Sequence, residues 1–255
     1  MRPHCKIKEN EMKPAIRNTL VAAAVTVMGF ASTAAHAYPA FTVDPTAYGG
    51  AATFTADKII GNYVETISFT SATDFNVSIV WEASQFAANN GTTPIFGGTS
   101  GLQSTYAMYA TFTGTGTAGV NTFTLNPGGA LNLYLDTTPL TPHAATDVHL
   151  ANGIALFGSA VITGNCSGGA FGCGNFSQTT TFDLTADGSN YFTAPNPFWA
   201  FSMQAGQFND INIGVIGDQI INGSMDAVFV VPEPASLALF GIGLLGAGLS
   251  RRKRS

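Results

Sequence analysis

The residues best suited to metal chemistry lie in one polar stretch, TPLTPHAATDVHLANG. His143, Asp147 and His149 fall within it, and imidazole and carboxylate groups are common metal ligands. Their spacing matches none of the usual metal-binding motifs. We therefore expect no metal site here, and we expect the two histidines to lie on a long polar loop.

Carboxylates are the other group of potentially reactive side chains. Between residues 38 and 231 a single lysine, Lys58, stands against 12 acidic residues, so this central part carries a net charge of about −11. Two carboxylates could serve as the acid and the nucleophile of a glycosidase. Such a site usually needs cationic or histidine partners, which are scarce here. Some acids also have local explanations, because Asp183 and Asp187 flank a turn and Asp74 precedes a strand. We expect a protein that is not an enzyme.

The same charge balance narrows the range of partners. Nucleic-acid binding needs clustered Lys and Arg, so we exclude it, and anionic membrane surfaces are disfavoured for the same reason. Calcium prefers oxygen ligands such as loop carboxylates and stays open as a cofactor, although no pattern assigns its ligands. Alternatively, the acids only keep an exported surface soluble.

Two cysteines and three aromatic residues have simpler explanations than a binding role. Cys166 and Cys173 lie in the Gly-rich stretch NCSGGAFGCGN. Their spacing is not CxxC, so we predict a local disulfide rather than a redox or metal site. The aromatic residues that could stack on sugars are Trp81, Phe198 and Trp199. Large aromatic side chains are mostly buried, and we predict core packing for all three.

The central part has the composition and periodicity of a β-protein. It is rich in Gly, Thr, Ser and aromatic residues, which disfavours helices and favours strands. Apolar and polar residues alternate in TDFNVSIVWEA and STYAMYATFTG, and Asn126–Gly129 resembles a hairpin turn. Two facing sheets would cover the apolar faces, so the sequence predicts a single antiparallel β-sandwich, jelly-roll-like, over residues 38–231. We expect no helix in it.

Further strands are predicted at residues 63–70, 154–162, 179–185, 198–204, 208–216 and 223–231, and loops at 89–104, 137–152 and 164–178.

The N-terminal segment has the features of a cleaved signal peptide over residues 1–37. The basic stretch that begins at Met12, which we take as the true start, precedes the apolar run 20–31. Ala35 and Ala37 then fit the small-x-small rule of signal peptidase. The alternative is an N-terminal membrane helix, but the apolar run is shorter than the roughly 20 residues that a span requires.

The C-terminal segment, residues 232–255, has three parts. Pro232, Glu233 and Pro234 interrupt regular structure. An apolar run follows, and a helix over residues 235–250 would be about 24 Å long, slightly short of the roughly 30 Å hydrocarbon core. The basic residues after it would hold that end on the cytoplasmic side: Arg251, Arg252, Lys253 and Arg254. We expect a short transmembrane helix that spans the inner membrane only transiently.

This C-terminal arrangement resembles the PEP-CTERM sorting signal, in VPEPAS, the Gly-interrupted apolar helix and the basic end. The resemblance implies recognition and cleavage by an exosortase near the PEP motif. The central part resembles flocculation-associated PEP-CTERM proteins, in stretches such as VSIVWEASQFAANNGTTP and CGNFSQTTTFDLTADGSNYFTAPNPFW.

That second resemblance implies an exported surface or matrix protein that promotes floc or biofilm formation with extracellular polysaccharide. It brings no catalytic residues. An alternative is a lectin-like module that binds the exopolysaccharide, with or without Ca²⁺. A glycosidase that trims the matrix is the least favoured function.

Overall fold

The computed structural model describes residues 38–139, 143–166, 171–196, 198, 201–211 and 215–230. The predicted signal peptide with Ala35 and Ala37 lies outside the described residues. The same holds for Trp199 and for the sorting segment with its PEP motif and basic end. Among the residues that are described, no helix combines the length and apolar character needed to cross a membrane.

Strands make up most of the described chain, with three short helical segments between them. A 3-10 helix, η1 (Thr46–Tyr48), and two short α-helices, α2 (Gly97–Ser100) and α3 (Ala186–Tyr191), contradict the expectation of no helix. In α3 the Thr185 side chain accepts a hydrogen bond from Gly188 N, which caps the first turn. The strands are β1 (Phe41–Val43), β2 (Phe54–Ala56), β3 (Lys58–Phe69), β4 (Asp74–Ala88), β5 (Thr93–Ile95), β6 (Ala107–Ala118), β7 (Thr122–Leu125), β8 (Ala130–Asp136), β9 (Val148–Cys166), β10 (Phe171–Thr181), β11 (Asp183–Leu184), β12 (Phe192–Ala194), β13 (Phe201–Ile211) and β14 (Gly217–Val230).

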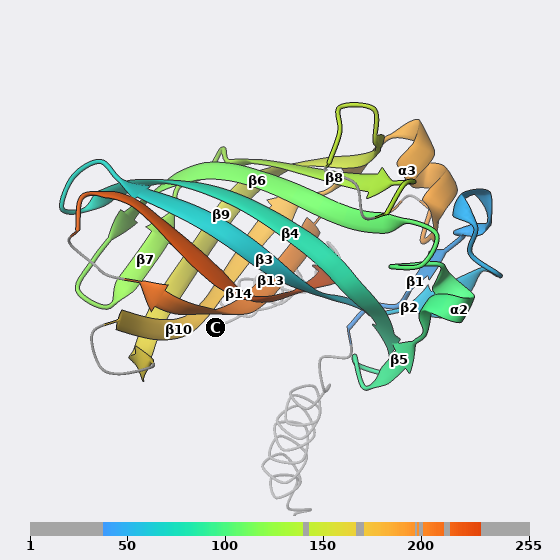
Figure 1. Ribbon diagram of the computed structural model, residues 1–255, viewed down its shortest axis with the longest axis horizontal. Coiled ribbons are helices and arrows are strands. Elements are labelled where there is room, and N and C mark those ends of the chain that lie inside the picture. The colour runs from blue at the N-terminus through green and yellow to red at the C-terminus, as the bar shows by residue number, and fades with distance from the viewer. Residues whose placement is uncertain are drawn as a thin grey trace, which may run out of the picture. The chain divides into compact units, whose positions relative to one another are not determined.

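The main sheet is antiparallel and closes on itself. Strands β4, β3, β14, β13, β10 and β9 are neighbours in that order, β7 and β8 follow β9, and β6 pairs with both. The additional pairing of β6 with β4 completes the ring (Figure 1). This arrangement corrects the predicted sandwich: the apolar faces are covered by curvature of one sheet around a shared interior, not by a second facing sheet.

The stretch Asn126–Gly129 interrupts a strand but does not reverse it. Strands β7 and β8 both pair with β6 on one side and with β9 on the other, so they form one broken strand. Gly128 N donates to Ala155 O at 2.9 Å, and Ala155 N donates to Gly129 O at 2.7 Å. The predicted hairpin is therefore wrong, because this segment bonds to the neighbouring strand instead of turning the chain back.

Other boundaries also shift. Most of the predicted loop 164–178 belongs to β9 and β10, and the last part of the predicted loop 137–152 is the start of β9. Residues 208–211 continue β13 instead of starting a new strand. Gly-rich sequence pointed to loops here, but pairing with long neighbours keeps the backbone extended.

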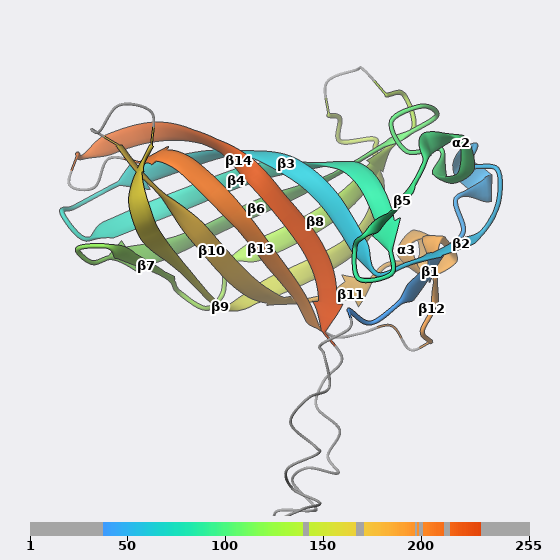
Figure 2. The ribbon, with the colours of Figure 1, turned by 90° about the horizontal axis from the view of Figure 1, so that it is seen from below.

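One end of the closed sheet is filled by a small second sheet and by aromatic side chains. Strands β12, β1 and β2 form this three-stranded sheet and lie at the same end as α2 and α3 (Figure 2). The Phe41 ring makes edge contacts with Phe86, Phe192 and Phe229 at centroid distances of 6.5, 5.9 and 5.0 Å. Such edge-to-face pairs add to the free energy gained from burial, so this end of the interior is closed by packed rings.

Trp81 lies in the interior at the middle of the sheet. It is 2% exposed, and its indole Nε1 donates to the carbonyl oxygen of Met225 at 2.8 Å. The prediction of core packing is confirmed for Trp81. The neighbouring strand makes room for the indole at Gly61, where an added Cβ would lie only 2.2 Å from Nε1.

Replacing Gly61 with Ala should therefore destabilise the protein. We expect the free energy of unfolding to fall by about 1–3 kcal/mol, because the new methyl group overpacks the core against Trp81. Urea unfolding of the purified variant measures this. Gly98→Ala is the matched control, since nothing lies within 4 Å of its added Cβ. Equal stability of the two variants would contradict the conclusion that Gly61 makes room for the Trp81 indole.

Candidate functional site

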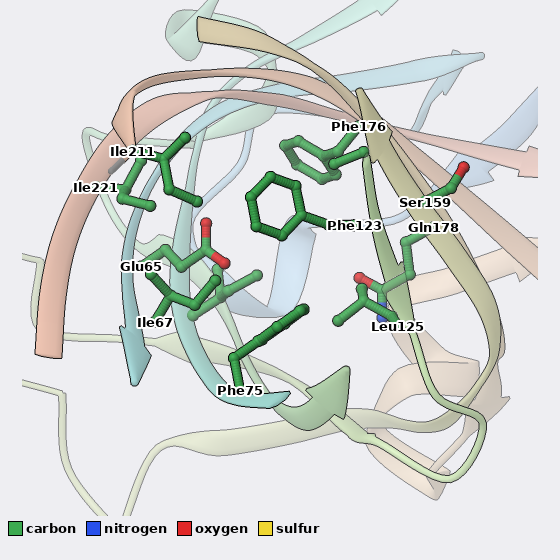
Figure 3. Close-up of a pocket in the computed structure, with 12 residues that line it drawn as sticks. Glu65, Ile67, Phe75, Phe123, Leu125, Ser159, Phe176, Gln178, Ile211 and Ile221 are labelled. Atoms are coloured by element: carbon green, nitrogen blue, oxygen red, sulfur yellow. The ribbon is translucent and has the colours of Figure 1, made fainter. Parts of the chain in front are cut away.

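A cavity of about 50 Å³ lies inside the closed sheet, on the side of Trp81 away from the small sheet. Its walls are mostly apolar and come from β3, β4, β7, β9, β10, β13 and β14. Three polar residues line it. Ser159 is exposed, whereas Glu65 and Gln178 reach the cavity from opposite walls, with the rings of Phe75, Phe123 and Phe176 between them (Figure 3). A cavity that combines apolar walls with a few convergent polar groups is the usual form of a small-molecule site.

Glu65 faces the interior because of its position in β3. Residues of one parity in this strand point inward, among them Tyr63, Ile67 and Phe69, and Glu65 shares that parity. It is paired in register with Ile79 on β4 and Ile221 on β14, which are both buried. Burial among these neighbours disfavours the carboxylate and raises the pKa of Glu65 to about 7.

Gln178 is the second unusual polar residue. It lies on β10 and is 1% exposed, and neither its Nε2 nor its Oε1 has a hydrogen-bond partner. A buried amide without a partner carries a cost of about 1–3 kcal/mol. Neither Glu65 nor Gln178 belongs to a motif that marks it in the sequence as a site residue. The period-two pattern could have found Glu65, since it falls in phase with the apolar residues of β3.

The two histidines lie at opposite ends of a row of stacked rings on the outer face of the sheet. His143 stacks on Tyr109 at a centroid distance of 3.6 Å, Tyr109 on Tyr134 at 5.2 Å, and Tyr134 on His149 at 4.8 Å. Two tyrosine rings therefore separate the imidazoles. Within the described ranges no cluster of three His, Cys, Asp or Glu residues could hold a metal ion.

Asp147 has a structural role in this row. Its Oδ2 accepts hydrogen bonds from Tyr109 OH and from Ala144 N, both at 2.8 Å. Burial, together with the hydrogen bond to Asp147, raises the pKa of Tyr109. The 143–147 segment is thus fastened to β6 by stacking and by one carboxylate.

The cysteines lie on neighbouring strands in a diagonal arrangement. Cys173 is opposite Gly164, and Cys166 is opposite Phe171. Diagonal neighbours are about 7–8 Å apart, beyond the roughly 4.4–6.8 Å between Cα atoms of most disulfides. The register does not support the predicted disulfide, and the two side chains lie outside the described part.

Phe198 is described and packs against the core. Its ring contacts Phe182, Phe192 and Phe229 at centroid distances of 5.9, 5.3 and 5.0 Å. Core packing is therefore confirmed for Phe198, which is not a candidate for stacking on sugars.

Comparison with protein families gives one match. Residues 230–254 match the PEP-CTERM protein-sorting motif, which begins where β14 ends. No curated protein and no solved structure matches the chain. The chain therefore carries a PEP-CTERM sorting signal. This motif indicates an exported protein that is targeted by exosortase and passes through the membrane.

The raised pKa of Glu65 predicts a pH-dependent difference between the wild-type protein and Glu65→Gln. The ordinary pKa is near 4.5 and the folded-state pKa is about 7, so between these values the folded protein holds a proton that the unfolded chain has released. Stability of the wild type should fall relative to the variant as pH rises through this window, by up to about 1.4 kcal/mol per pH unit. Above pH 7 the difference should stay constant.

Urea unfolding between pH 4.5 and 8.5 measures this difference. Asp183→Asn is the matched control, because it removes one carboxylate from an exposed position. Parallel pH profiles of stability for the wild type and Glu65→Gln would show that folding does not raise the pKa of the Glu65 carboxyl group.

Proposed function

We propose that the protein is a non-enzymatic component of the cell surface or extracellular matrix, which promotes floc or biofilm formation together with extracellular polysaccharide. The sorting motif at residues 230–254 carries this proposal, because it provides export and exosortase processing. The strongly acidic body fits a soluble exported domain.

The use of the carboxylates supports a structural role for this domain. Most of the described acids hold the chain locally instead of converging on a site. Asp57 accepts hydrogen bonds from Asn90 N at 2.6 Å and Gly91 N at 2.9 Å, which fixes a turn whose residues have positive φ. Asp44, Asp74 and Asp218 bond to nearby Thr or Ser hydroxyls, and Asp226 pairs with Lys58. A glycosidase needs two free carboxylates facing one bond.

The sorting motif provides the first test. Replacing Pro232, Glu233 and Pro234 with Ala should block C-terminal processing, so that the protein keeps its hydrophobic tail, stays in the membrane fraction and no longer supports flocs. Intact mass spectrometry of each cell fraction, together with a settling assay, measures this.

Ser250→Ala is the control, because it changes the same segment outside the Pro-Glu-Pro residues. Normal floc formation by cells whose protein stays unprocessed would contradict the matrix role. That result would not contradict targeting of the protein by exosortase.

Incubation with the purified extracellular polysaccharide tests whether the domain is an enzyme. We expect no increase in reducing ends over time, because most of the described acids are engaged in local contacts. We also expect retention on the immobilised polysaccharide to be the same with and without a calcium chelator. New reducing ends would identify a glycosidase, and loss of retention with chelator would identify a calcium-dependent lectin.

A further inference from the structure

The cavity holds two polar groups that have no hydrogen-bond partner among the described residues. Among the described residues nothing donates a hydrogen bond to the Glu65 carboxyl group, and burial is the one cause of its raised pKa. Both polar atoms of Gln178 are also unpartnered and buried. A buried polar group is normally hydrogen-bonded to protein or to an ordered molecule, so the buried Gln178 amide calls for a partner from outside the chain, and the partly exposed Glu65 carboxyl group is open to the same partner.

The cavity walls favour a positive charge. The faces of aromatic rings attract cations, and Phe75, Phe123 and Phe176 lie around the space between Glu65 and Gln178 (Figure 3). The carboxylate of Glu65 and the amide oxygen of Gln178 attract cations as well. An ammonium group is the cation that suits the rings, the carboxylate and the amide oxygen alike.

Residues 38–231 have no lysine or arginine to spare for this site. Lys58 is the one Lys or Arg between residues 38 and 231, and its Nζ is held 2.5 Å from Asp226 Oδ2. The net charge of about −11 over the same residues favours the approach of cations from solution. Glu65 is only half-buried, so the site is in contact with solvent.

The size and the walls of the cavity select an organic cation over a metal ion. A volume of about 50 Å³ holds a few water molecules, at roughly 10–15 Å³ each, and thus admits a ligand of a few heavy atoms. Calcium would need about six to eight oxygen ligands, whereas this cavity offers mainly Ile, Leu and Phe side chains.

We propose that the cavity binds a small primary alkylammonium ion, whose charged head lies against Glu65 and the phenyl rings and bonds to the Gln178 amide oxygen. The short alkyl part contacts the aliphatic walls, including Ile67 and Ile221. The site is independent of the proposed matrix role, because its residues lie inside the sheet and not on the outer surface.

Isothermal titration calorimetry tests this on protein purified from cells that express the full chain. The probe is ethylammonium chloride at pH 8, compared with ethanol as the neutral analogue and with potassium chloride at equal ionic strength. We expect saturable binding of ethylammonium that is at least about tenfold tighter than that of ethanol, and no heat of binding for potassium chloride.

Two variants identify the residues. Glu65→Gln should weaken ethylammonium binding about tenfold or more, since it removes the charge at the site, and Gln178→Leu should weaken it several-fold. Glu82→Gln is the control, with unchanged affinity, because Glu82 is on the outer face. Circular dichroism verifies that each variant is folded.

The pH dependence of affinity needs no variant. From the strands paired with β3, Ile79 and Ile221 lie opposite Glu65, and among the described side chains Tyr63 on β3 is a titratable group that interacts with it. Protonation of Glu65 should therefore weaken binding up to tenfold per pH unit below pH 7, where ethylammonium stays charged. Equal affinity for ethanol, unchanged binding by Glu65→Gln, a flat pH profile, or no binding at all would overturn the proposal and leave a cavity filled with water.

Discussion

The structure depends on the closure of one antiparallel sheet. Because β4 pairs with both β3 and β6, the strands of the ring are hydrogen-bonded on two sides and share a single interior. Every inward side chain must then fit into that one space, and most outward side chains face solvent. This explains why apolar and polar residues alternate so regularly in β3 and β4. It also explains why β3 has Gly61 at the point where the indole of Trp81 packs against it.

The interior is filled unevenly along its length. Interlocking rings and the small β1–β2–β12 sheet close one end, and Tyr106 and Tyr191 share a hydrogen bond there at 2.6 Å. Toward the β3–β4 turn the inward side chains leave a cavity, and there the protein places a carboxyl group and an amide. An apolar pair at these two positions would be more stable by ordinary packing rules, so the polar pair is the feature of this core that needs a functional reason.

Export and ligand binding rest on separate parts of the chain. The sorting motif is a linear signal at residues 230–254 and is recognised as sequence. The folded body has few basic groups and uses most of its described acids in turns and in pairs with Lys58 and His143, which suits a stable exported domain. The stacked row from His143 to His149 serves the same purpose, because it fastens a loop to the outer face.

The sequence by itself determined the β-class, the inward position of most core residues including Trp81, and the sorting signal, because each depends on local period or on a linear motif. It did not determine that one sheet closes on itself, that Asn126–Gly129 interrupts a strand without reversing it, or that the Gly-rich stretch around Cys166 is extended. These depend on pairing between distant strands, and alternation is the same in a sandwich and in a closed sheet. Only the tertiary structure showed that Glu65 and Gln178, which are 113 residues apart in the chain, face one cavity, because closure is what brings β3 and β10 to opposite walls of a common interior.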